Sequence, residues 1–141
     1  MYAVALLVTS VLLSEKPSFR VEISSQTRDS YVTTSFSEKD FEDIPRWATD
    51  KEHPPVSAKK AIRAAEMVRA KIVADKDGWE WKLDMVALHP APDGHWYYVV
   101  SYEATSKDIA IVGLPPRLSL VVLMDGNVVK PAVRKLADKK R

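Results

Sequence analysis

The sequence predicts an α+β fold in which one main helix packs on an antiparallel meander of three to four strands, preceded by an N-terminal strand or hairpin. Two observations support this prediction. Residues 57–76 have the apolar periodicity of an amphipathic helix, and three later segments have strand composition and are joined by turns that contain Gly or Pro. A helix followed by consecutive antiparallel strands is typical of α+β domains, in which the helix covers one face of the sheet.

The composition is that of an ordinary globular domain. The chain has 141 residues, of which 46% are hydrophobic and 28% are charged, so it is long enough for one domain with a sizeable core. A net charge of +2 lacks the strong positive excess of a dedicated nucleic-acid binder. The absence of cysteine excludes disulfides, thiolate metal ligands and cysteine nucleophiles.

Residues 1–17 are interpreted as a signal peptide or N-terminal apolar segment. The run Met1–Leu13 carries no charge and has the length of a signal-peptide core, so we expect an exported protein, either periplasmic or secreted. The alternative is a buried N-terminal strand in a cytoplasmic protein. No other segment is apolar enough to cross a membrane.

Residues 18–56 are predicted to hold N-terminal strands, a short helix and a linker. Residues 19–23 and 31–36 have strand composition and are separated by a polar loop, which favours a hairpin. Ser37 begins a short helix that ends before Pro45. Residues 38–52 hold six acids and three bases, and we expect a solvated linker there rather than a calcium site, which would need a central glycine.

Residues 57–141 are predicted to form the helix and the antiparallel sheet. Ser57 is a suitable N-cap, and Ala61 and Ala65 lie on the stripe that faces the core. Asp77-Gly78 is expected to end the helix at about residue 76. The strands are expected at these residues: Trp79–Met85 with strict alternation, Trp96–Glu103 after the turn Pro90–Gly94, Leu118–Met124, and Val128–Val129 after an Asp-Gly-Asn turn.

This order of motifs resembles the PepSY-like, cystatin-resembling domains of exported bacterial proteins. The resemblance covers roughly residues 54–130, and these residues carry it: Pro54, Pro55, Ser57, Ala61, Ala65, Trp81, Trp96, Tyr97, Tyr98, Val99, Asp125 and Gly126. It implies a small extracytoplasmic module, and the family offers no catalytic residue to carry over. Residues 18–56 have no counterpart in it.

Two histidines near one turn are the only candidates for a metal site. His89 and His95 flank Pro90–Gly94, and Asp93 lies between them, so the three side chains could supply nitrogen and oxygen ligands to zinc or copper. Hairpin pairing separates the two histidines, however, and a site needs further converging ligands. We therefore expect both histidines to be exposed residues beside a turn, and we predict no metal and no cofactor.

The chain is rich in aromatic residues between positions 79 and 102. An aromatic surface beside basic residues can bind single-stranded nucleic acid or glycans. We expect these rings instead to fill the space under the alanine-rich helix, because strand alternation directs them to one face. The basic residues after position 129 are expected to form a frayed, solvated end.

The search for catalytic and nucleotide-binding motifs is negative, so we expect a binding module rather than an enzyme. The predicted partner is a peptide or protein that pairs with a sheet edge, and no nucleic-acid partner is expected. Pro131 favours an edge at Val128 and Val129, and Tyr97 and Glu103 are expected on the exposed face of the sheet. The alternative is a small-molecule binder or enzyme with a pocket between the helix and the curved sheet.

Overall fold

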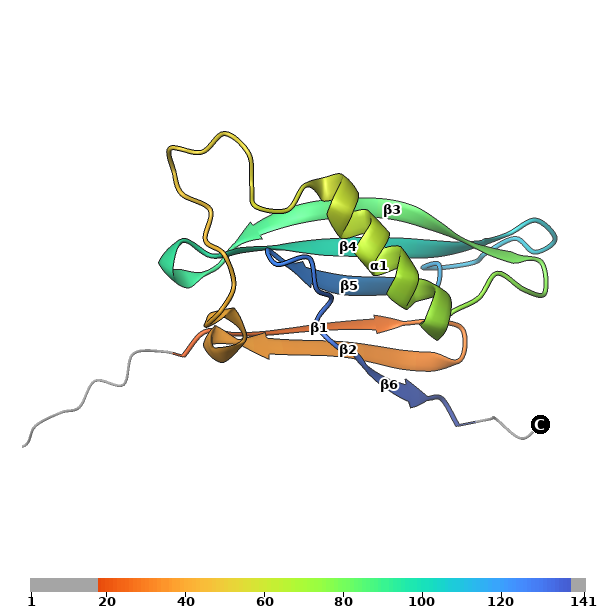
Figure 1. Ribbon diagram of the computed structural model, residues 1–141. Coiled ribbons are helices and arrows are strands. Elements are labelled where there is room, and N and C mark those ends of the chain that lie inside the picture. The colour runs from red at the N-terminus through yellow and green to blue at the C-terminus, as the bar shows by residue number, and fades with distance from the viewer. Residues whose placement is uncertain (1–17, 138–141) are drawn as a thin grey trace, which may run out of the picture.

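Figure 1 shows the computed structural model of the protein, which describes residues 18–137. The described residues form a mixed α+β structure that consists mostly of sheet. Six strands assemble into two antiparallel three-stranded sheets, with strand orders β1-β2-β6 and β3-β4-β5. The strands and helices are β1 (Arg20–Gln26), β2 (Ser30–Ser37), η1 (Glu38–Phe41), α1 (Ala58–Ile72), β3 (Trp79–Pro90), η2 (Pro92–Gly94), β4 (Trp96–Ser106), β5 (Arg117–Leu123) and β6 (Ala132–Lys135). The apolar run Met1–Leu13 lies outside the described residues.

The predicted N-terminal hairpin is confirmed by the pairing of β1 with β2. Thr27 closes its turn, because the Thr27 backbone N–H donates to the Ser30 carbonyl (2.9 Å) and the Thr27 hydroxyl oxygen accepts from the Ser30 N–H (3.1 Å). The other edge of β2 pairs with β6. The expectation of a frayed end after position 129 is therefore wrong for β6, which extends the N-terminal sheet.

The second sheet is the meander β3-β4-β5, which differs from the prediction in one strand. The register of β3 against β4 shifts between Leu83 and Met85, which is a β-bulge. One extra residue in a strand reverses the alternation of the side chains that follow. Met85 therefore lies on the face opposite Leu83, and the predicted strict alternation through Met85 is wrong.

Helix α1 begins where it was predicted and ends four residues earlier. The Ser57 hydroxyl oxygen accepts a hydrogen bond from the Lys60 backbone N–H (3.2 Å), which is the expected N-cap. The helix stops at Ile72. Asp77 and Gly78 have φ values of +55° and +77° and form the tight turn that opens β3, so these residues do not cap the helix.

Side chains from both faces of β4 and β5 are buried. One cluster lies between α1 and the meander, where Ala61 and Ala65 have no exposed surface. It also contains Tyr98, Val100, Tyr102, Leu118, Leu120, Val122 and Met124. A second cluster lies between the meander and the β1–β2 hairpin and contains Phe36, Phe41, Tyr97, Val99, Val121 and Leu123. Because the hairpin covers the face of the meander opposite α1, residues 18–56 belong to the same packed unit as the rest of the described chain.

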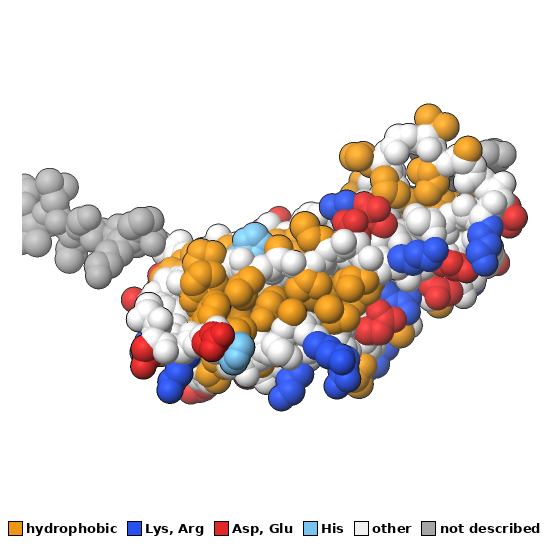
Figure 2. Space-filling model, turned by 90° about the horizontal axis from the view of Figure 1, so that it is seen from above, with side chains coloured by type: hydrophobic (Ala, Val, Ile, Leu, Met, Phe, Trp, Pro, Cys, Tyr) orange, Lys and Arg blue, Asp and Glu red, His pale blue; other side chains and the backbone are white. Residues whose placement is uncertain are grey.

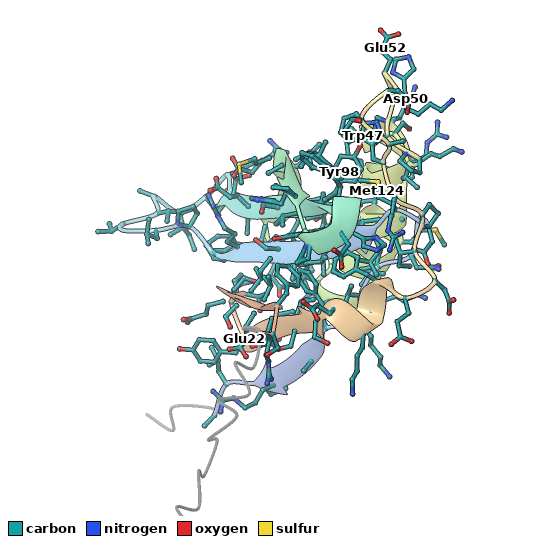
Figure 3. All side chains as sticks on the ribbon, turned by 90° about the vertical axis from the view of Figure 1, so that its left-hand side faces the viewer. Glu22, Trp47, Asp50, Glu52, Tyr98 and Met124 are labelled. Carbon is teal, nitrogen blue, oxygen red and sulfur yellow. The ribbon has the colours of Figure 1, made fainter. Side chains whose placement is uncertain are left out.

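The segment between η1 and α1 crosses one end of the meander and anchors there through a tryptophan. The Trp47 ring meets the Trp96 ring edge to face at 5.3 Å, and the Trp47 backbone N–H donates to the Gly94 carbonyl (3.1 Å). Figure 3 shows Asp50 and Glu52 at the outer end of this segment, far from Glu22 on β1. The acidic residues Asp50 and Glu52 are solvent-exposed, as expected for a solvated linker.

Candidate functional site

The histidines that flank the β3–β4 connection pack against two different aromatic rings. The His89 ring stacks on the Tyr97 ring at 5.3 Å, and the His95 ring packs against Phe41 at 5.1 Å. Among residues 18–137, no three His, Asp or Glu side chains are close enough together to bind a metal ion. The expectation that His95 is exposed is wrong, because it is only 8% exposed.

Burial also sets the acid–base behaviour of His95. Loss of solvation and the nearby Arg46 guanidinium lower the pKa of His95, and the Asp93 carboxylate only partly opposes them. The His95 Nδ1 atom is buried and has no hydrogen-bond partner. His95 is therefore a packed, neutral side chain at the end of the hairpin, and Asp93 beside it stays exposed with a φ of +59°.

The structure also places the residues that were predicted to bind a partner. Tyr97 lies in the buried cluster between the sheets with 7% of its surface exposed, so the expectation that it lies on an open face is wrong. Glu103 is half-buried and forms an ion pair with Arg117. The segment that holds Val128 and Val129 runs beside β5, where the Val129 N–H donates to the Val121 carbonyl (2.9 Å). The Val129 N–H is therefore not available to a partner strand.

A long open edge of the meander is the outer side of β3. This strand has 12 residues and pairs only with β4, so every second residue directs its N–H and C=O away from the sheet. Its first half is protected by charge. Glu80 forms ion pairs with Lys107 (2.9 Å) and Lys82 (3.4 Å), and Asp84 pairs with Arg117 (3.2 Å). Charged side chains on an edge strand discourage pairing with another chain.

The second half of β3 has no such protection. Residues 85–89 read Met-Val-Ala-Leu-His and hold no Asp, Glu, Lys or Arg. The bulge separates this stretch from the charged half. Met85 is 46% exposed, which is high for a large apolar side chain. The unpaired backbone of residues 85–89 is thus the part of the described sheet best suited to accept another strand.

A groove runs between this half of β3 and the start of α1. Its volume is about 510 Å³, and its walls are Val86 and Leu88 from β3, Ser57 and Ala58 from α1, and the preceding residues His53 and Pro54. Tyr98 forms the floor and is fixed there, because its hydroxyl donates to the Val56 carbonyl (2.8 Å). Figure 2, which looks down on the β3 edge, shows a continuous hydrophobic surface bordered on one side by basic side chains.

The basic border comes from the exposed face of α1. The helix carries five basic residues and one acid, Glu66, which is already paired with Arg69. Its first turn contains Lys59 and Lys60 and no acidic residue. The surface beside the groove is therefore positive and favours a ligand that combines apolar side chains with acidic ones.

The sequence predicted an open sheet edge at Val128 and Val129, and it did not predict the open edge at β3. A signal for it was present, because Val86-Ala-Leu88 continues the strand beyond Met85 without a charged residue. The predicted strand stopped at Met85, and this continuation was therefore missed.

Two further observations concern the chain as a whole. Within residues 18–137, no helix combines the length and the apolar character needed to cross a membrane. No family model, curated protein or solved structure matches this chain.

Proposed function

We propose that this protein is a non-catalytic binding module that recognises an extended segment of a partner peptide or protein by adding it as a strand to β3. The observation that carries the proposal is the uncharged, unpaired half of β3 at residues 85–89, which lies beside an apolar groove. Backbone pairing supplies affinity in this mode of recognition, and pockets for alternate side chains supply specificity. The groove at Val86 and Leu88 supplies such a pocket.

The chemistry of the partner follows from the surroundings of the groove. Every second side chain of the added strand would lie over Val86, Leu88 and Tyr98, where β-branched or aromatic residues fit best. Acidic residues that flank this paired stretch would lie near the basic first turn of α1, because the alternate side chains within the stretch point to the other face of the sheet. The proposed ligand is therefore an extended peptide with apolar side chains at alternate positions of a stretch of about five residues and acidic residues beside that stretch.

The cellular setting and the family are proposed on the sequence alone. The uncharged run Met1–Leu13 supports an exported protein. The order of motifs over roughly residues 54–130 supports a PepSY-like domain. A small exported module of this kind would act by binding to a protein outside the cytoplasm.

The test selects ligands without assuming their identity. The protein is immobilised and panned against a phage-displayed library of random 12-residue peptides, and the affinity of enriched peptides is measured by fluorescence anisotropy. We expect enriched peptides to hold apolar residues at alternate positions with acidic residues beside them, and we expect them to slow hydrogen exchange at the backbone amides of β3. Enrichment of no peptide above the level of an unrelated protein would overturn the proposal.

A matched pair of variants locates the site. Met85→Glu adds a charge to the open half of β3, whereas Met67→Glu adds the same charge to the outer face of α1, where Met67 is 68% exposed. We expect Met85→Glu to weaken peptide binding by about tenfold or more and Met67→Glu to change it by less than about threefold. Equal effects of the two substitutions would show that the peptides do not pair with β3.

A further inference from the structure

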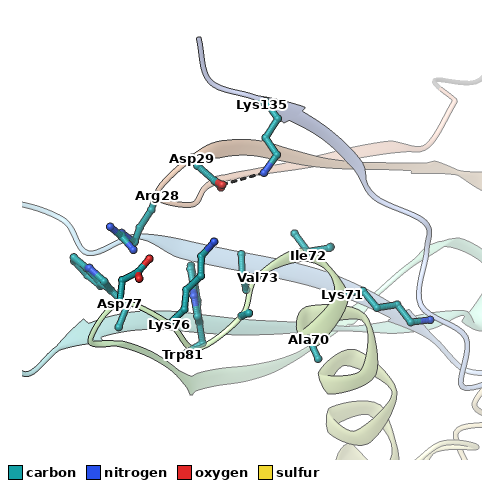
Figure 4. Close-up of a pocket in the computed structure, with 12 residues that line it drawn as sticks. Arg28, Asp29, Ala70, Lys71, Ile72, Val73, Lys76, Asp77, Trp81 and Lys135 are labelled. Atoms are coloured by element: carbon teal, nitrogen blue, oxygen red, sulfur yellow. Dashed lines mark hydrogen bonds and ion pairs between the residues drawn. The ribbon is translucent and has the colours of Figure 1, made fainter. Parts of the chain in front are cut away.

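A second pocket lies at the opposite end of α1 from the groove. Its volume is about 380 Å³, which is within the range of small-molecule sites. Three parts of the chain that are far apart in sequence meet there: the turn of the β1–β2 hairpin, the end of α1 with the turn that follows it, and β6. Figure 4 shows Lys76 extending from the turn before β3 into the space below Arg28 and Asp29.

The pocket is positively charged. Four cationic residues line it, Arg28, Lys71, Lys76 and Lys135, against the two carboxylates of Asp29 and Asp77, but Figure 4 shows the Lys71 side chain extending away from the other three. Lys135 is engaged by Asp29 at 2.9 Å, and this hydrogen bond is the main reason that the pKa of Asp29 is lowered. Within residues 18–137, neither Lys71 nor Lys76 forms an ion pair. The lining thus has an excess of positive charge, which favours an anion.

One wall of the pocket is apolar. Ile72, Val73, Trp79 and Trp81 contribute to it. The Arg28 guanidinium lies over the Trp79 ring at 4.6 Å, which holds a planar hydrogen-bond donor at the edge of the site. Apolar walls with a few fixed polar groups are typical of sites for small organic molecules, because the walls supply affinity and the polar groups supply orientation.

The walls are held in place by hydrogen bonds behind them. The Asp75 carboxylate accepts from the Trp81 backbone N–H (2.8 Å) and lies 3.5 Å from an Arg69 guanidinium nitrogen. Arg69, which is 9% exposed, also donates to the Val73 carbonyl (3.4 Å) and forms an ion pair with Glu66. These contacts connect the end of α1 to the start of β3. A site whose supporting residues are fixed in this way pays less conformational entropy when a ligand binds.

We propose that this pocket binds a small organic phosphate monoester. Its dianionic phosphate would be held by Lys76 and the Arg28 guanidinium, whose parallel N–H groups match two phosphate oxygens. The organic part would lie against Ile72 and Trp79. This site shares no residue with the β3 groove, so it is independent of the peptide-binding function proposed above.

The test uses three probes with the full chain: phenyl phosphate, inorganic phosphate and benzyl alcohol. Binding is followed by isothermal titration calorimetry and by the NMR signals of the tryptophan indole N–H groups. We expect phenyl phosphate to bind most tightly, with an affinity that falls as NaCl is raised. Inorganic phosphate should bind more weakly because it has no apolar part, and benzyl alcohol should bind weakly because it has no charge.

Variants then test whether phenyl phosphate binding requires the positive charge of Lys76. We expect Lys76→Met to weaken phenyl phosphate binding about tenfold or more and Lys76→Arg to retain most of it. Lys60→Met, at the other end of α1, is the matched control and should bind as the unsubstituted protein does. The proposal is overturned if phenyl phosphate does not bind below about 10 mM, if inorganic phosphate binds equally well, or if Lys60→Met and Lys76→Met lose affinity equally. Peptide binding at β3 should be unchanged in Lys76→Met, so either proposal can fail without the other.

Discussion

Replacement of Ala65 by leucine tests whether α1 is packed directly against the meander. Ala65 has no exposed surface and belongs to the cluster beneath α1. Two of the strands that this helix contacts, β4 and β5, carry large fully buried side chains in the same cluster, among them Tyr102, Leu118, Leu120 and Val122. A leucine adds three carbon atoms to a site that has no room for them, so either the helix or the side chains beneath it must move.

The size of the effect follows from the packing. Insertion of methylene groups into a filled core typically costs about 1–3 kcal/mol, whereas the helix propensities of alanine and leucine differ by only a few tenths. For a domain of this size, each kcal/mol lowers the melting temperature by about 4 °C. We therefore expect Ala65→Leu to lower the free energy of unfolding by about 1–3 kcal/mol and the melting temperature by about 4–12 °C.

The measurement is urea unfolding followed by circular dichroism and by tryptophan fluorescence, with thermal unfolding in parallel. Ala70→Leu is the control, because Ala70 is an exposed residue of the same helix. It should change the free energy of unfolding by less than about 0.5 kcal/mol. An Ala65→Leu variant that is as stable as Ala70→Leu would refute the close packing of α1 on β4 and β5.

Two further variants test other parts of the structure. Burial lowers the pKa of His95 from 6.5, so His95 takes up a proton more readily in the unfolded chain than in the folded one. The stability that neutral His95 contributes is therefore complete above about pH 6.5 and is lost as the pH falls toward the folded-state pKa. His95→Phe should therefore reduce the loss of stability between pH 7 and pH 5 in urea titrations, and an unchanged pH dependence would contradict this account. In the β4–β5 loop, Val112 and Leu114 are each 96% exposed, so replacing both with serine should change the free energy of unfolding by less than about 0.5 kcal/mol. A substantial destabilisation would show that the loop packs against the domain.

Local sequence patterns predicted the elements well but not the environment of each face. The alternation Tyr98, Val100, Tyr102 correctly placed one face of β4 under α1. The same alternation placed Tyr97 on the other face, which a single meander would leave open to solvent. The β1–β2 hairpin covers that face, and Tyr97 is buried against Phe36 at 4.9 Å between ring centroids. Periodicity separates the two faces of a strand, but contacts between distant segments decide which face meets water.

The candidate sites were harder to predict because each is assembled from distant segments. Arg28, Lys76 and Lys135 have no local pattern that connects them, and they meet only after β6 pairs with β2. The open edge of β3 likewise depends on distant segments, because β3 is an edge only if no other strand of the chain pairs with its outer side. Pro131 suggested an edge near Val128, where the structure has a single bridge to β5, whereas the 12-residue β3 pairs on one side only.

The positions of the two cavities have a common physical cause in the packing of α1. A straight helix on a twisted sheet keeps close contact over a short central length, because the strands turn away from the helix axis on both sides. Ala61 and Ala65 make that central contact close. The space that remains at the ends is lined at one end by Ala58 and at the other by Ile72, and these are the first and last residues of the helix. Larger side chains at the central positions would raise the whole helix and change both cavities at once, so peptide binding and anion binding should both change in Ala65→Leu, although the two sites share no residue.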